Sequence, residues 1–254
     1  MVDIIFFLVL GVIQGILEWL PVSSSGNITL LLVHVSNVSF SEAVKVSFFL
    51  HAGTMLSVMV KFRQRLYELT KDVIYRKKTP FSYFYVVATL FSCLIGVALY
   101  WLLELEIPDM IGSLLIAFFL VITGVIIRTR KAGLKTMQET TVKDACLVGI
   151  AQGIAVIPGI SRSGTTIAAL LSRGVNQKDA LELSFLLSIP PVLGLMLLTF
   201  SGFHPVYVIS LVVSFVFSLF SMEILLRAAE NLDFSWFCFA VALVTIIIVG
   251  MQVI

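Results

Sequence analysis

The sequence predicts an all-α integral membrane protein, both from its composition and from its pattern of long apolar runs. Apolar amino acids make up 59% of the 254 residues, only 13% are charged, and the mean hydropathy is +1.07. A soluble domain carries roughly 25% charged residues. A soluble globular fold, a disordered chain and a nucleic-acid binder built on a basic face are therefore excluded. We expect one polytopic membrane domain over residues 1–254.

Six stretches are long and apolar enough to cross a bilayer as helices, which satisfy their own backbone hydrogen bonds. A further apolar stretch covers 3–20. The six predicted transmembrane helices are 41–60, 81–103, 109–127, 179–200, 205–226 and 235–254.

Two shorter apolar pairs follow a different pattern, because a small polar run interrupts each of them. The breaks are 21–26 and 158–164, both rich in Pro, Gly and Ser, and the apolar runs after them are too short to span a bilayer. Irregular backbone at membrane depth is tolerated only where it is buried in protein or lines a cavity. We therefore predict two re-entrant helical hairpins.

The chain also repeats itself with a shift of 138 residues, so that Gln14 falls on Gln152 and the serines of the first polar break fall on those of the second. Each half is then one broken hairpin followed by three crossings, and the second half must enter the membrane from the opposite face. The sequence predicts an inverted-topology repeat, with repeat 1 at about 1–128 and repeat 2 at about 143–254. In such a repeat the two polar breaks meet near the midplane.

Charge predicts the orientation of these crossings. The loops 61–78 and 128–143 are rich in Lys and Arg, whereas the loops on the opposite side carry none. The positive-inside rule places the basic loops in the cytoplasm of a multi-pass protein of the cell (plasma or inner) membrane.

Two charged residues at membrane depth need a partner or a task. A charge at the centre of a membrane helix costs roughly 3 kcal/mol on insertion scales. Arg162 lies in the second break, Glu18 lies beside the first, and Gln14 shares a helical face with Glu18. Either Glu18 and Arg162 form a structural ion pair, or they bind a polar headgroup. We favour the headgroup site, because intramembrane charges of this kind are usually functional.

Hydroxyl groups surround these charges. We expect Gly26 and Gly164 to open short helices whose free N-terminal amides point into the gap between the breaks. Free amides, hydroxyls and one arginine together form an anion site, for which phosphate is the natural ligand. Any single serine could instead cap a helix. The hydroxyl residues are Ser23, Ser24, Ser25, Ser161, Ser163, Thr165 and Thr166.

At these residues the chain resembles the undecaprenyl-pyrophosphate phosphatase family, also called the bacitracin-resistance protein family. Gln14 and Glu18 match its first motif, and 158–166 meets its PGxSRSxxT motif in full. The stretches 51–54 and 184–190 also look like the family. The resemblance implies removal of one phosphate from a polyprenyl diphosphate lipid, which recycles the carrier for cell-wall polymers.

The resemblance also implies roles for single residues. Ser24 would be the nucleophile, Arg162 would clamp phosphate, and Glu18 with Gln14 would hold a divalent cation (Mg²⁺ or Ca²⁺) or act as a base. The site would open to the outer face of the membrane. The implied phosphate-binding residues are Ser23, Ser25, Asn27, Ser161, Ser163, Gly164 and Thr166.

One position departs from the family pattern. The family usually has a histidine where this chain has Asn27. An asparagine can donate a hydrogen bond or contact a metal, but it does not shuttle a proton near pH 7. Glu18 or a metal-bound water would then supply the proton step.

The inverted repeat leaves a second function open, that of a flippase or transporter for a polyprenyl phosphate without hydrolysis. Other expected contacts are the surrounding membrane lipids. Small residues on the helices would permit a homodimer.

Overall fold

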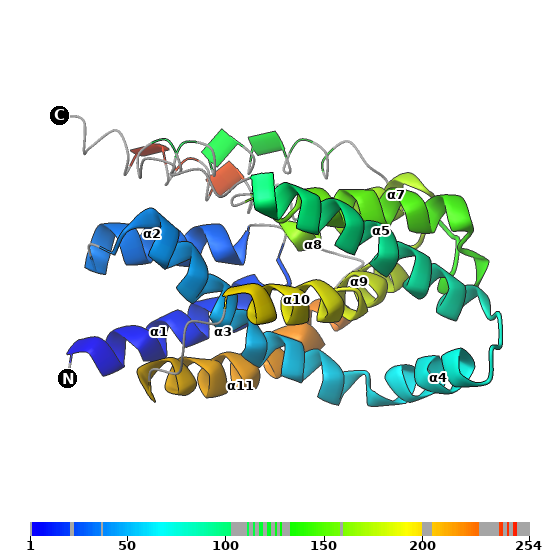
Figure 1. Ribbon diagram of the computed structural model, residues 1–254, viewed down its shortest axis with the longest axis horizontal. Coiled ribbons are helices and arrows are strands. Elements are labelled where there is room, and N and C mark those ends of the chain that lie inside the picture. The colour runs from blue at the N-terminus through cyan, green and yellow to red at the C-terminus, as the bar shows by residue number, and fades with distance from the viewer. Residues whose placement is uncertain are drawn as a thin grey trace.

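The computed structural model describes residues 2–20, 23–36, 38–102, 133–157, 160–199 and 205–228, with single positions between 111 and 128 and between 239 and 247. Within that part of the chain the regular elements are helices (Figure 1). The predicted crossings 109–127 and 235–254 lie largely outside the described residues, as do Pro21, Pro158 and Gly159.

Four described helical stretches, one of which is made of two consecutive helices, are long and apolar enough to cross a membrane, and each corresponds to a predicted crossing. They are Phe40–Lys61, Pro80–Trp101, Gln177–Leu198 and Tyr207–Arg227. The short helices predicted beside the polar breaks also form. The chain is therefore an all-helical, multi-pass membrane protein.

The first half of the chain contains α1 (Val2–Leu17), α2 (Ser24–Ser36), α3 (Phe40–Lys61), α4 (Arg63–Ile74) and α5 (Pro80–Leu102). The second half contains the 3₁₀ turn η1 (Met137–Glu139), α7 (Val142–Ile154), α8 (Arg162–Ser172), α9 (Gln177–Leu186), α10 (Ile189–Thr199) and α11 (Pro205–Ala228). In Figure 1, α1, α3 and α11 lie together on one side, and α5, α7 and α8 lie together on the other.

Two elements differ from the prediction. The basic loop 61–78 contains α4, an amphipathic helix that buries Leu69 while its charged side chains face outward. The predicted crossing 179–200 is divided into α9 and α10. Pro190 and Pro191 lack the N–H groups that would continue the helical hydrogen bonds across this point.

Glycines allow helices of the two halves to approach closely. A Cβ atom at Gly11 would lie 2.6 Å from the Ser210 carbonyl oxygen, and one at Gly15 would lie 2.7 Å from that of Ser214. These contacts join α1 to α11. Small residues at helix interfaces are the usual means by which membrane helices pack without a hydrophobic driving force.

The corresponding contacts in the second half join α7 to α5. A Cβ atom at Gly149 would lie 2.5 Å from the Ala88 carbonyl oxygen, and one at Gly153 would lie 2.7 Å from Ile95 Cβ. The first helix of each half therefore packs on a long helix of the other half. Both glycine pairs have the same spacing of one helical turn.

An ion-pair cluster fixes the start of α7. Asp144 is fully buried, and its carboxylate accepts hydrogen bonds from Lys135, from Arg173 and from the Thr141 backbone N–H at 2.8 Å. Burial alone would raise the pKa of Asp144, but the hydrogen bonds from Arg173, Lys135 and Thr141 outweigh it and hold the pKa well below its usual range. The cluster connects the segment before α7 to the end of α8.

Candidate functional site

The first polar break contains a strained residue, Ser23, directly before the start of α2. Ser23 has a φ of 53°, which is uncommon for a residue with a side chain. Its hydroxyl accepts a hydrogen bond from the Gly26 N–H at 3.3 Å, and its carbonyl accepts one from the Asn27 N–H at 3.0 Å. Ser23 thus caps α2 and places Ser24 at the first helical position. Backbone strain of this kind is concentrated at functional sites.

The second break is capped in the same way. The Ser161 hydroxyl accepts a hydrogen bond from the Gly164 N–H at 3.1 Å, and α8 begins at Arg162. The prediction that the Gly26 and Gly164 amides are free is therefore wrong. Serine caps start each helix two residues earlier than predicted, so the N–H groups without an intrahelical partner belong to the first helical residues.

The two breaks meet at Glu18 and Arg162. The Arg162 guanidinium donates through Nη2 to Glu18 Oε1 and through Nη1 to the Ser184 carbonyl oxygen at 3.0 Å. The side chain of Arg162 is 15% exposed and that of Glu18 only 4%. A second bond joins the breaks, because Ser163 Oγ donates to the Leu20 carbonyl oxygen at 2.8 Å. The predicted convergence of the two breaks is confirmed.

The other carboxylate oxygen of Glu18 contacts three more side chains. Oε2 accepts hydrogen bonds from Gln14 Nε2 at 2.9 Å and from Ser24 Oγ at 2.6 Å. It also lies 3.0 Å from His51 Nε2. Gln14 and Ser24, which the sequence assigned to the site, thus share one oxygen with a histidine that it did not.

His51 comes from α3 and faces the nucleophile candidate. Its Nε2 lies 3.3 Å from Ser24 Oγ, and its Nδ1 lies 2.6 Å from the Ser47 carbonyl oxygen. A carbonyl oxygen only accepts hydrogen bonds, so Nδ1 carries a proton and donates it. Nε2 is then the atom directed at Ser24 and Glu18. In the sequence, His51 is a lone histidine inside an apolar span. Its spacing from Glu18 and Ser24 does not indicate that it contacts them from another helix.

The remaining predicted site residues divide into two groups. Ser25, Ser161 and Ser163 line the same cavity as Ser24 and Arg162. Thr166 and Asn27 do not line it. The Thr166 hydroxyl is fully buried and bonds to the Arg162 carbonyl oxygen at 2.8 Å, while Asn27 Nδ2 donates to the Ser23 carbonyl oxygen at 3.0 Å.

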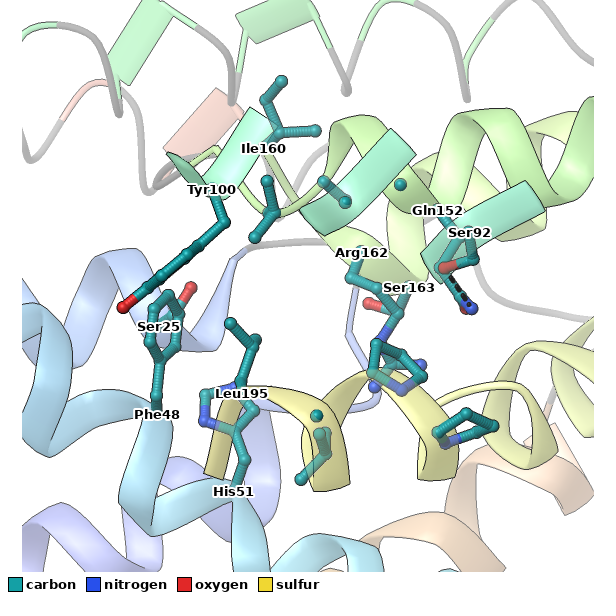
Figure 2. A pocket seen from close by; sticks show the side chains of 18 of the residues that line it. Ser25, Phe48, His51, Ser92, Tyr100, Gln152, Ile160, Arg162, Ser163 and Leu195 are labelled. Atoms are coloured by element: carbon teal, nitrogen blue, oxygen red, sulfur yellow. Dashed lines mark hydrogen bonds between the residues drawn. The ribbon is translucent and has the colours of Figure 1, made fainter. Parts of the chain in front are cut away.

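The cavity has a volume of about 120 Å³. Figure 2 shows its polar residues His51, Arg162 and Ser163 beside apolar ones. A cavity that is polar in one part and apolar in another suits an amphiphilic molecule. Its apolar lining comes from α3, α5 and α10 and includes Phe48, Val97, Tyr100, Leu195 and Leu198.

Gln14 and Glu18 offer oxygen ligands for a hard cation. Gln14 is fully buried, and its Oε1 has no hydrogen-bond partner. The described residues contain no group of three or more His, Cys, Asp or Glu side chains that could hold a metal. Mg²⁺ typically takes only one or two protein oxygens and completes its shell with water and substrate phosphate. Glu18 lines the cavity and can offer one of them, whereas Gln14 does not line it and turns its Nε2, not its Oε1, toward Glu18.

Comparisons with known proteins agree over nearly the whole chain. The sequence model of a family described as "Bacitracin resistance protein BacA" matches residues 7–247. The chain is 40% identical to a protein named undecaprenyl-diphosphatase from Methanothrix thermoacetophila, over 96% of each chain. It is 38% identical to a protein of the same name from Methanopyrus kandleri, over 90% of this chain and 89% of the relative. A third protein of that name, from Methanococcoides burtonii, is 34% identical over 94% of this chain and 96% of the relative.

Proposed function

Since the chain belongs to the bacitracin resistance protein BacA family, we propose that it is an undecaprenyl-diphosphatase, an integral membrane hydrolase that removes the terminal phosphate of undecaprenyl diphosphate. The relatives' names support this reaction. The observation that carries it is the position of Ser24, whose hydroxyl lies between Glu18 and His51 in a cavity that Arg162 also lines.

Ser24 is the nucleophile in this proposal. Its Oγ attacks the terminal phosphorus, and the bond from that phosphorus to the bridging oxygen breaks, which releases undecaprenyl phosphate. The Ser24 proton passes to His51 Nε2 or to Glu18, since both atoms lie within 3.3 Å of Oγ. Water then hydrolyses the phosphoserine and yields inorganic phosphate. His51 thus takes the proton-transfer role for which Asn27 is chemically unsuited.

Arg162 neutralises the charge that develops on the phosphoryl oxygens. It carries a permanent positive charge and stands at the first position of α8, where the helix dipole and the unpaired first-turn amides also favour an anion. Its bond to the Ser184 carbonyl oxygen holds the guanidinium in place. When the diphosphate enters, its oxygens compete with Glu18 for Nη2. Preorganised donors of this type supply most of the stabilisation in phosphoryl transfer.

A divalent cation, Mg²⁺ or Ca²⁺, would be held by the Glu18 carboxylate, and Gln14 Oε1 would join it once the Gln14 amide turns over and gives up its Nε2 bond to Glu18. When bound, it would offset the negative charge of the diphosphate. The unpaired amide oxygen of Gln14 supports this assignment.

The finer architecture is part of the same proposal: six transmembrane helices and two re-entrant hairpins, related as an inverted repeat. Two matched features support it. The Ser23 and Ser161 hydroxyls each accept a hydrogen bond from the N–H three residues further on, at the starts of α2 and α8. The glycine contacts of α1 with α11 have counterparts in those of α7 with α5. An inverted repeat brings two such breaks together near the midplane.

The lipid tail would leave the cavity past its apolar lining, between α5 and α10. The basic loops would lie in the cytoplasm by the positive-inside rule. Pro80 then marks the cytoplasmic end of α5, and the apolar part of the cavity around Tyr100 lies nearer the outer face. A cavity whose apolar part lies toward the outer face fits a site that opens to that face.

The test uses purified protein and undecaprenyl diphosphate in detergent, with and without a divalent cation, and measures released phosphate. We expect release by the wild type and none by Ser24→Ala. The same proteins in liposomes address the flippase alternative, which the relatives' names do not support. Exchange of lipid phosphate between leaflets without phosphate release would contradict the proposal.

A further inference from the structure

The cavity extends beyond Arg162 to a pair of polar side chains that the reaction described above does not use. Gln152 on α7 and Ser92 on α5 both line it, and Gln152 Nε2 donates to Ser92 Oγ at 3.1 Å. Figure 2 shows Arg162 between this pair and Tyr100. Ser92 and Tyr100 are both on α5 and lie about 12 Å apart at 1.5 Å per residue. The pair therefore forms the end of the cavity opposite its apolar end.

Gln152 has an unsatisfied group in this place. The residue is only 3% exposed, and its Oε1 is buried without a hydrogen-bond partner. Burying a polar atom without a partner is costly, and native structures contain few such atoms. Because Gln152 also lines the cavity, its amide is placed to contact a molecule bound there.

The surrounding charges favour an anion as this ligand. The N-terminus of α8 faces the same cavity through Ser161 and Arg162, and it adds first-turn N–H groups and the positive end of a helix of 11 residues. Among the described residues that line the cavity, Glu18 alone carries a carboxylate, and Arg162 pairs with it.

The Gln152 amide can supply donors for an anion by a rotation that keeps its bond to Ser92. If the amide turns by half a revolution, the Ser92 hydroxyl donates to Oε1 and the NH₂ group faces the cavity. Every polar atom of the pair is then satisfied once an anion accepts from the NH₂ group.

We propose that Gln152 and Ser92 form a second phosphate subsite, at the end of the cavity farthest from the lipid tail. The inference rests on the proposed function. The phosphate group has two possible sources, the terminal phosphate of the bound diphosphate or the inorganic phosphate released from it. Their recognition chemistry is the same.

The test measures product inhibition in the full-length protein. Gln152→Leu and Ser92→Ala each remove a polar group with little change in volume. We expect the inhibition constant for inorganic phosphate to rise about tenfold in both, while inhibition by undecaprenyl phosphate stays within twofold of wild type. The matched control is Thr89→Val, which removes a hydroxyl on α5 that does not line the cavity. It should leave both constants unchanged.

The kinetics also separate the two sources of phosphate. If the terminal phosphate of the bound lipid occupies the subsite, KM for undecaprenyl diphosphate rises together with the inhibition constant. If only released phosphate does, KM stays constant. Both patterns support the subsite. Unchanged phosphate inhibition in both variants, with a wild type that hydrolyses its substrate, would refute it, whereas a wild type without phosphate release refutes the proposed function itself.

A third variant distinguishes an anion from a cation. Gln152→Glu keeps the shape of the side chain and adds a negative charge, so it should weaken inhibition by inorganic phosphate at least tenfold. If the activity of Gln152→Glu instead became more dependent on Mg²⁺ while its inhibition by phosphate stayed unchanged, the pair would be a cation site and the inference would be overturned. Thermal unfolding in detergent shows whether each variant is folded. If a Gln152 variant is not folded, the phosphate inhibition constant of Ser92→Ala, which lacks only one oxygen atom, tests the subsite.

Discussion

Ser24 Oγ lies 2.6 Å from Glu18 Oε2 and 3.3 Å from His51 Nε2, so a single hydroxyl is held by a carboxylate and an imidazole from two different helices. The strained backbone of Ser23 directs Ser24 into this position, and the Ser47 carbonyl oxygen orients the imidazole. A serine hydroxyl held between a carboxylate and an oriented imidazole has the geometry that the proposed nucleophile requires.

Replacing His51 should reduce turnover without abolishing binding. General-base catalysis contributes typically 10²–10⁴-fold, so we expect His51→Gln to lower kcat by about that range while KM changes less than threefold. The assay is phosphate release from undecaprenyl diphosphate. His34→Gln is the matched control, because His34 does not line the cavity, and it should have wild-type kcat. Equal rates in the two variants would exclude His51 as the base.

Replacing Arg162 with lysine should be nearly as damaging as replacing it with alanine. The guanidinium contacts Glu18 and the Ser184 carbonyl oxygen with two different nitrogens, a span that a single ammonium group does not cover. We expect at least a hundredfold loss of kcat/KM for Arg162→Lys. Arg65→Lys, at a half-exposed surface ion pair with Glu182, is the control and should retain activity. Full activity of Arg162→Lys would show that charge alone suffices.

The glycine contact between α1 and α11 predicts a stability effect. A Cβ atom at residue 15 would lie 2.7 Å from the Ser214 carbonyl oxygen and 2.8 Å from Phe217 Cβ. Gly15→Ala should therefore destabilise the protein by about 1–3 kcal/mol, the usual cost of overpacking. Gly194→Ala has open space around its Cβ, so its Tm should be unchanged or slightly higher. The measurement is thermal unfolding in detergent, and a Tm for Gly15→Ala equal to wild type would contradict the packing.

The ion-pair cluster at Asp144 predicts a pH dependence of stability. The folded-state pKa of this carboxyl lies below its usual value of about 4. A depressed pKa stabilises the fold at pH values above the unfolded-state pKa, and this contribution is lost as pH falls through the acidic range. Wild-type Tm should therefore drop between pH 6 and pH 3 more steeply than that of Asp144→Asn, which lacks the titrating group. Parallel pH curves would disprove this.

Much of the fold was accessible from the sequence because lipid imposes simple rules. Length and hydropathy located the crossings at 41–60, 81–103 and 205–226, and Pro, Gly and Ser located the polar breaks. The helix within 61–78 was missed because basic residues dominate that segment, and its stability depends on packing Leu69. The division of 179–200 depends on two adjacent prolines that hydropathy does not register.

The sequence predicted the charged residues of the site but not all of its other residues. Glu18 and Arg162 stood out because isolated charges at membrane depth need partners. His51 was missed as a catalytic candidate, because only the tertiary packing of α3 brings it to Ser24. The free amides expected at Gly26 and Gly164 were wrong because neighbouring serine hydroxyls cap them, a competition that residue type alone does not decide.

The glycine-lined contact of α1 with α11 has a consequence for biogenesis. The glycine face of α1 is complete when the first helix leaves the ribosome, but its partner is synthesised only after most of the chain has been inserted. Glu18 and Ser24 follow this helix directly, so they acquire their final surroundings at a late stage of assembly. A chain truncated before α11 would therefore lack the helix on which α1 packs.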